Sequence, residues 1–136
     1  MHKETAMAFV EAINGKDTKA ILSLMAEDHV FIDAYGRRED KKAMEQGWPG
    51  YFAWFPDYKI EVDTLLEQDD TVVLLGYAGG TYQGRHRKDG RYTWRLPAAW
   101  RVVVADEKIA VWQVYADSKI PYEIIEKGEG TELDSF

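Results

Sequence analysis

Apolar residues recur at helical spacing near the start of the chain. Phe9, Val10 and Ile13 fall on one face of a helix predicted over residues 4–13. The Asn-Gly pair at residues 14–15 predicts the end of this helix, because both residues tolerate the left-handed backbone conformation. A tight connection and a second short helix should follow, and the two helices should form an antiparallel pair.

Acidic residues mark where the next two helices begin. Asp17 can cap the second helix, and Glu39 or Asp40 can open a third. Residues 47–50 (Gly-Trp-Pro-Gly) interrupt the third helix, since an interior proline removes a hydrogen bond and clashes with the preceding turn. We therefore expect a kink or a break there, followed by an aromatic second half that ends near residue 55.

The remaining pattern is that of strands. A short apolar run over residues 29–36 forms the first strand, and alternating or glycine-bearing segments follow after the third helix. In residues 91–105 one set of alternating side chains is large and apolar, and this set should face the core. Glycines at 76, 79 and 80 suggest a bend or bulge in a curved strand. The later strands are predicted at residues 58–68, 71–83, 91–105 and 109–117, with a short helix near residues 121–126.

This order, α-α-β-α-β-β-β-β with a possible terminal helix, predicts an α+β fold in which helices cover one face of a mostly antiparallel sheet. A chain of 136 residues is the size of one domain. We assign that domain to residues 1–127. Residues 128–136 are acidic and glycine-containing, and we expect a mobile tail there.

Composition narrows the function classes. The net charge of −7 argues against a nucleic-acid partner, because most of the surface would repel a phosphate backbone. The chain has no Cys and only three scattered His, so no metal site and no cofactor is expected. No stretch approaches the ~20 apolar residues that cross a membrane, and a cytoplasmic protein is the default expectation. The basic segment 85–91 contains Asp-Gly and is interpreted as an exposed hairpin tip, with an anion or partner contact as the alternative.

Asp33 is the most informative polar residue. It lies among Phe31, Ile32 and Tyr35, where an acid is either a turn-former or a carboxylate held in an apolar pocket. In a pocket it would serve as a general base that removes a proton next to a carbonyl. In a turn it would end the strand through an Asx-type hydrogen bond. His29 has the same strand parity, so it could line the same cavity or lie in solvent at the start of the strand.

Several segments resemble the SnoaL-like polyketide cyclases and the ketosteroid isomerases of the nuclear transport factor 2-like superfamily. Each segment is weakly specific alone, but together they cover most of residues 6–126 in the order found in the family. They are Phe-Val-Glu-Ala-Ile-Asn-Gly-Lys-Asp (9–17), Leu-Met-Ala-Glu-Asp-His-Val-Phe-Ile-Asp (24–33), Trp-Phe-Pro-Asp-Tyr-Lys-Ile-Glu-Val (54–62), Gly-Thr-Tyr-Gln-Gly (80–84), Lys-Ile (108–109) and Trp-Gln-Val-Tyr-Ala-Asp (112–117).

The resemblance implies a curved sheet wrapped against three helices as a cone, with a deep apolar cavity and a homodimer formed through the outer face of the sheet. It places Asp33 at the position of the proton-shuttling aspartate of the ketosteroid isomerases. Their oxyanion tyrosine falls at Phe9, and their second oxyanion acid falls near Ala98 or Ala99. The acid that cyclases and limonene epoxide hydrolases carry in the last strand corresponds to Val114.

The epoxide hydrolases also use an Arg and Asp pair, which would lie near Thr81 and Gln83 and is absent. Loss of one oxyanion donor typically costs ~10²–10³ in rate. Steroid isomerisation by the known route and epoxide hydrolysis by the known residues are therefore not expected.

Three hypotheses remain: an acid–base isomerase or cyclase without a metal, a non-catalytic protein that binds a small apolar or aromatic molecule, and a dimerising module whose cavity is filled by its own side chains. Asp33 is the predicted base, and Tyr35, Tyr82 or His29 would support it. Large rings such as Trp48, Tyr51 and Trp54 could form a stacking wall. The predicted ligand-binding residues are Phe9, His29, Tyr35, Trp48, Phe52, Phe55, Tyr82, Trp94, Trp100 and Val114.

Overall fold

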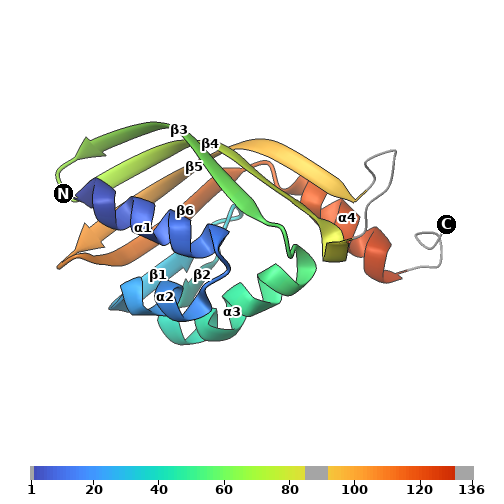
Figure 1. The fold of residues 1–136 in the computed structure, drawn as a ribbon, viewed down its shortest axis with the longest axis horizontal. Helices are drawn as coiled ribbons and strands as arrows, with labels where there is room; N and C mark the ends of the chain where they lie inside the picture. Colours follow the sequence, from blue (N-terminus) through green and yellow to red (C-terminus); the bar gives the residue numbers. More distant parts are fainter. Residues whose placement is uncertain (1, 85–91, 131–136) are drawn as a thin grey trace.

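A curved six-stranded sheet with helices packed on one side forms the protein (Figure 1). The structure, a computed structural model, describes residues 2–84 and 92–130. In chain order its elements are α1 (His2–Asn14), α2 (Thr18–Leu24), β1 (Met25–Ile32), β2 (Arg38–Asp40), α3 (Lys41–Trp54), β3 (Lys59–Gln68), β4 (Thr71–Thr81), a 3-10 turn (Tyr82–Gly84), β5 (Thr93–Ala105), β6 (Lys108–Ala116) and α4 (Lys119–Gly130).

The strands lie in the order β2-β1-β6-β5-β4-β3. All neighbouring pairs are antiparallel except β1 and β6, which run parallel. The α+β class with a mostly antiparallel sheet is therefore confirmed. The short strand β2, which pairs with β1, was not predicted, because its three residues are exposed and carry no apolar alternation.

The helices begin where the acidic residues indicated. The Asp17 carboxylate accepts the Ala20 backbone N–H at 3.1 Å, and the Asp40 carboxylate accepts the Ala43 N–H at 2.8 Å. Each bond satisfies one of the free N–H groups of a first helical turn. Helix α1 packs across β3 to β6, and α3 packs against β1 (Figure 1).

Two local predictions need correction. Helix α3 continues through Pro49 as one element, so of the predicted kink or break the break does not occur. Proline costs the helix a hydrogen bond, but Met44, Trp48 and Phe52 bury one continuous face of α3, and that packing favours a single helix. At the end of α1 the residue with positive φ is Lys16, at 53°, rather than Asn14 or Gly15.

The core lies between the helices and the inner face of the sheet. Trp94, Trp100 and Val102 on β5 are buried while Arg95 is exposed, as the alternating pattern predicted. Across the sheet, β3 and β4 shift register between Val62 and Thr64, opposite Gly76. The bulge was predicted in the glycine-bearing strand, but the extra residue lies in β3, opposite Gly76 of β4.

Two predictions concern segments that lie wholly or partly outside the described residues. The predicted hairpin tip at 85–91 lies outside the described residues. Helix α4 continues to Gly130, so the first three residues of the predicted tail are helical, and 131–136 are outside the described residues.

Within the described ranges, no helix is long and apolar enough to cross a membrane. Within the same ranges, no three His, Asp or Glu side chains group closely enough to hold a metal ion.

Candidate ligand-binding site

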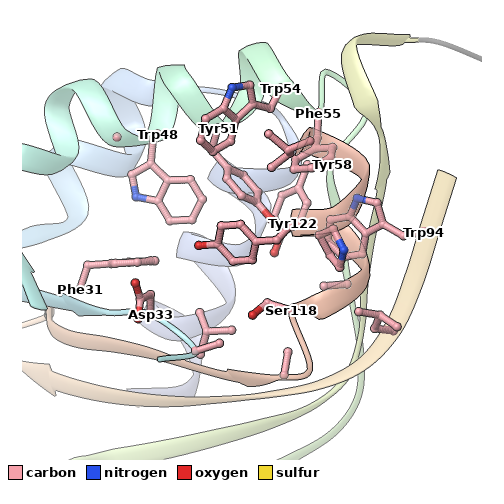
Figure 2. Close-up of a pocket in the computed structure, with 18 of the residues that line it drawn as sticks. Phe31, Asp33, Trp48, Tyr51, Trp54, Phe55, Tyr58, Trp94, Ser118 and Tyr122 are labelled. Carbon is pink, nitrogen blue, oxygen red and sulfur yellow. The ribbon is translucent and has the colours of Figure 1, made fainter. Parts of the chain in front are cut away.

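A cavity of about 260 Å³ lies between α3, α4 and the inner face of the sheet (Figure 2). Its walls come from the end of β1, from α3, from the loop before β3, from β4 to β6 and from α4. Elements that are far apart in the sequence therefore meet around one space. Most of its surface is aromatic or aliphatic, and such surface favours an apolar occupant.

Helix α3 supplies one aromatic wall. Trp48 and Tyr51 lie three residues apart, which places them on the same side of the helix, and Phe55 follows directly after its last residue. The Trp48 and Tyr51 rings meet edge to face with centroids 6.4 Å apart, and Tyr51 meets Phe55 in the same way at 5.2 Å. These mutual contacts hold the rings in fixed orientations.

Tyr58 and Trp94 form the adjoining wall. The Tyr58 ring stands at 89° to Tyr51 with centroids 4.9 Å apart, and it lies 6.1 Å from the Trp94 ring. The ammonium group of Lys16 donates hydrogen bonds to the Tyr58 and Asn14 carbonyl oxygens. Burial lowers the pKa of Lys16. The end of α1 thus anchors the segment that carries Tyr58.

Helix α4 closes the cavity on another side with Pro121, Tyr122 and Ile125. Partial burial raises the pKa of Tyr122, and the nearby Asp33 carboxylate raises it further because it would repel a tyrosinate. Tyr122 is 39% exposed and its ring lies 5.6 Å from that of Tyr35. The hydroxyl of Tyr122 and the carboxylate of Asp33 therefore belong to the same part of the site (Figure 2).

Asp33 satisfies both interpretations offered by its sequence. It follows the last residue of β1, and its Oδ1 accepts the backbone N–H groups of Tyr35 and Arg37, each at 2.9 Å. It is therefore a turn-former. It also lines the cavity, and its Oδ2 lies 3.9 Å from the Arg37 guanidinium. One carboxylate oxygen is committed to the turn, and the other accepts no hydrogen bond from the described residues.

The described part of the cavity wall carries little formal charge. Among the described residues that line it, Asp33 alone carries a formal charge at neutral pH. The other polar side chains in the described lining are neutral: the hydroxyls of Tyr51, Tyr58, Tyr122 and Ser118, and indole nitrogens. A carboxylate or phosphate ligand would find no cation there to compensate the loss of its hydration.

Five of the predicted catalytic and ligand-binding residues line this cavity: Asp33, Trp48, Phe55, Trp94 and Val114. Tyr51 and Trp54, named for the stacking wall, line it too. The structure brings them together from β1, α3, the following loop, β5 and β6. Whether any of them binds a ligand or acts in catalysis stays a prediction.

The other predicted residues lie elsewhere. Phe9, Phe52 and Trp100 are buried in the core and are absent from the cavity lining. Phe9 packs against Trp112 at 4.9 Å, and Trp100 lies 6.3 Å from that same ring. The family resemblance placed Phe9 at the site, and Phe52 and Trp100 were expected there as large aromatic rings. Neither argument measures depth along the inward face, and these rings fill the core beside the cavity.

The predicted supporting donors also lie outside the lining. Tyr35 is 58% exposed, because the turn built on Asp33 directs it outward, and Tyr82 is buried against Phe55 and Tyr92. His29 is neither in the cavity nor in solvent. It is 1% exposed, and its Nδ1 lies 2.8 Å from the Ile109 carbonyl oxygen. Pairing of β1 with β6 covers this residue, and that pairing is not visible in the local sequence.

The sequence prediction omitted Tyr58, Trp112 and Tyr122 from the site. Tyr58 shares its strand parity with Ile60, and Trp112 shares its parity with Val114, so alternation contained the signal for both. Tyr122 comes from α4, whose position over the cavity depends on tertiary packing.

Comparisons with known proteins agree with this architecture. The sequence profile of the SnoaL-like domain matches residues 6–112. No curated protein is similar enough to the chain to count as a match. Many solved structures share the fold, and three of them illustrate the range of proteins that do.

IdmH, a candidate polyketide cyclase from Streptomyces antibioticus, is 20% identical with a TM-score of 0.75, covering 92% of this chain and 98% of its own. AclR, a candidate hydroxylase from Streptomyces galilaeus, is 19% identical with a TM-score of 0.74, covering 93% and 96%. A protein with a ketosteroid isomerase-like fold from Catenulispora acidiphila, solved with trimethylamine, is 20% identical with a TM-score of 0.71, covering 82% and 84%. At these identities the likeness shows the fold alone.

Proposed function

This chain belongs to the SnoaL-like family, and from that premise we propose that it binds a compact apolar or aromatic molecule in the cavity between α3, α4 and the sheet. The observation that carries the proposal is the lining itself, in which aromatic rings surround the space and one acid supplies the only formal charge among the described lining residues. Such a surface gains free energy when an apolar molecule displaces water from it.

The volume indicates the size of the ligand. A dry cavity of ~150 Å³ is large enough for benzene, and pockets for drug-sized molecules begin near ~300 Å³. At about 260 Å³ this cavity suits a molecule of one or two rings rather than a four-ring steroid. The ligand is therefore expected to be smaller than the substrates of the ketosteroid isomerases.

Tryptophan fluorescence tests this proposal, since Trp48, Trp94 and Trp112 line the space. Titration with naphthalene should change the emission of the parent protein in a saturable manner. Trp48→Ala removes a ring from the wall and should weaken binding by at least tenfold if the variant stays folded. Unchanged emission in the parent, or equal affinity of the folded variant, would contradict binding at this site.

A second candidate function, proton transfer by Asp33, is favoured by one observation: the carboxylate lies on the cavity wall and its Oδ2 accepts no hydrogen bond from the described residues. This oxygen would accept a proton from a carbon of the bound molecule and return it to another carbon, so that the carboxylate ends unchanged. Without that step the protein would be a non-catalytic binder.

The Asp33→Asn variant separates these functions, because an amide oxygen can still accept the two turn hydrogen bonds. With 2-tetralone in deuterated water, the parent should exchange the ketone's α-hydrogens faster than buffer does, and Asp33→Asn should exchange them at the buffer rate. Equal exchange rates in parent and variant would remove the assignment of Asp33 as a base and would leave ligand binding untouched.

We also propose a homodimer formed through the outer face of the sheet. Leu75 on β4 and Tyr115 on β6 are 38% and 52% exposed. Both pair with Ala99 of β5, which lies between them, so they are on the same face of the sheet. Exposed apolar side chains on a sheet face are suited to a second copy of the chain. Light scattering should give twice the monomer mass, and Tyr115→Glu should lower it; a monomeric parent at all concentrations would exclude the dimer.

A further inference from the structure

Two tyrosine hydroxyls stand in the cavity without a partner in the described part of the chain. Tyr51 comes from α3 and Tyr58 from the loop before β3, and Figure 2 shows both rings directed from the wall toward the middle of the cavity. No hydrogen bond joins either hydroxyl to a side chain or backbone group among the described residues. A hydroxyl that lacks a partner in an apolar environment costs free energy, so this arrangement needs an explanation.

Both hydroxyls remain protonated and can donate. Burial raises the pKa of Tyr58 and raises that of Tyr51 well above its ordinary value, and the neighbouring Tyr58 and Tyr122 oppose ionisation of Tyr51 further. The indole N–H groups of Trp48 and Trp94 also lack partners within the described residues, but neighbouring atoms cover them. The Tyr51 and Tyr58 hydroxyls are thus donors that a bound molecule can reach, beside the Tyr122 and Ser118 hydroxyls of the other walls.

Neighbouring aromatic rings hold the two tyrosine rings close together. The rings stand perpendicular with centroids 4.9 Å apart, and each has a further aromatic neighbour: Phe55 at 5.2 Å from Tyr51 and Trp94 at 6.1 Å from Tyr58. Fixed rings lose little further freedom when their hydroxyls bind a ligand, which makes two weak donors effective together.

We propose that the Tyr51 and Tyr58 hydroxyls jointly bind the oxygen of an uncharged ligand, so that the cavity selects a one- or two-ring molecule carrying a neutral acceptor such as a carbonyl. This inference rests on the proposed function, because it uses the same cavity. A hydrocarbon leaves both hydroxyls without a partner, and a carboxylate meets no cation among the described lining residues and is repelled by Asp33. The neutral acceptor satisfies both donors at no such cost.

Four ligands with one carbon skeleton test the selection: tetralin, 2-tetralone, tetralin-2-carboxylate and 2-aminotetralin as its ammonium form. Affinities are measured by tryptophan fluorescence in the parent protein, in Tyr51→Phe, Tyr58→Phe and the double variant, and in Tyr115→Phe as a matched control on the outer face. Replacing Tyr by Phe keeps the rings and their packing, so these variants are expected to fold, and circular dichroism checks this.

The parent and Tyr115→Phe should bind 2-tetralone about tenfold more tightly than tetralin, as one or two neutral hydrogen bonds allow. The double variant should bind both compounds equally, with tetralin affinity unchanged. The carbonyl stretching band of bound 2-tetralone should lie at lower wavenumber in the parent than in the double variant, which reports the hydrogen bonds directly.

Four results would overturn the inference. Equal binding of tetralin and 2-tetralone by the parent, or a ketone preference that persists in the double variant, would remove the role of the two hydroxyls while leaving the proposed function in place. Tightest binding of the ammonium compound would identify Asp33 and the ring faces as the recognition element. Absence of binding by all four compounds would remove this inference and the proposed function together.

Discussion

The Asn14 side chain forms with Ile60 both hydrogen bonds that a neighbouring strand would form. Its Nδ2 donates to the Ile60 carbonyl oxygen at 3.0 Å, and its Oδ1 accepts the Ile60 backbone N–H at 2.8 Å. The last residue of α1 thereby fixes the start of β3, two residues after Tyr58. The geometry of the cavity wall depends on this connection between a helix end and an edge strand.

Replacing Asn14 by Leu should lower the free energy of unfolding by roughly 1–3 kcal/mol, because two backbone groups of Ile60 lose their partner in a partly buried place. Urea denaturation followed by fluorescence measures the change. Ser23→Ala is the control, since its exposed hydroxyl bonds only to the Ala20 carbonyl within its own helix. A loss no greater than that of the control would show that water replaces the amide without cost.

Gly76 is expected to tolerate no side chain. A Cβ at this position would lie 1.8 Å from the Glu61 carbonyl oxygen, where the β3 backbone crosses close to β4. Gly76→Ala should therefore destabilise the protein by several kcal/mol or prevent folding, since the obstacle is backbone and cannot rotate away. Thermal denaturation and soluble yield report the effect.

Gly50 supplies the matched control for that substitution. A Cβ there meets nothing within 4 Å, and the residue is exposed within α3. Gly50→Ala should raise stability by ~0.5–1 kcal/mol through helix propensity. Comparable stability of the two alanine variants would mean that β3 and β4 adjust their separation freely.

The helix ends and strand faces could be predicted because they depend on neighbours in the sequence. Asp17 and Asp40 cap helices through bonds to residues three positions later, and Trp94 alternates with exposed Arg95. The burial of His29 depends instead on pairing with Ile109, 80 residues away, and nothing near His29 in the sequence reports that contact.

The sequence predicted an aromatic cavity but only some of the residues that line it. The family resemblance placed Val114 and Phe9 at site positions, and Trp48 was one of the rings expected to form a stacking wall. Trp48 and Val114 line the cavity, but Phe9 is fully buried in the core and packs against Trp112. Which inward rings meet empty space depends on the curvature of the sheet and on where α4 packs, and both are properties of the whole fold.

Acid should destabilise the protein through His29. Burial lowers the pKa of this imidazole. The bond to the Ile109 carbonyl opposes that shift in part, nearby Lys41 adds to it, and Asp28 opposes it slightly. Because the folded pKa lies below the unfolded value, the unfolded chain binds more protons as the pH falls through ~6.5 and below. Stability is therefore retained above that pH and lost beneath it, by up to ~1.4 kcal/mol per pH unit from this group.

The His29→Gln variant should show a shallower loss of stability between neutral pH and pH 5 than the parent, whatever its stability at neutral pH. Unfolding free energies from urea titrations at several pH values give this slope. His2→Gln is the control, because His2 lies at the chain surface beside Glu67. Identical slopes for the parent and His29→Gln would assign the acid sensitivity to other groups.

Filling the cavity should abolish binding without harming the fold. Ala78 is 5% exposed on β4 and lines the cavity, so Ala78→Leu would place three further carbon atoms in the space that a ligand would occupy. Naphthalene affinity should fall at least tenfold, while the melting temperature should hold or rise because apolar surface becomes buried. Ala53→Leu makes the same change on the exposed side of α3 and should leave affinity unaltered. A folded Ala78→Leu protein that binds naphthalene as tightly as the parent would place the ligand outside this cavity; a marked fall in melting temperature would mean instead that the side chain collides with the aromatic wall.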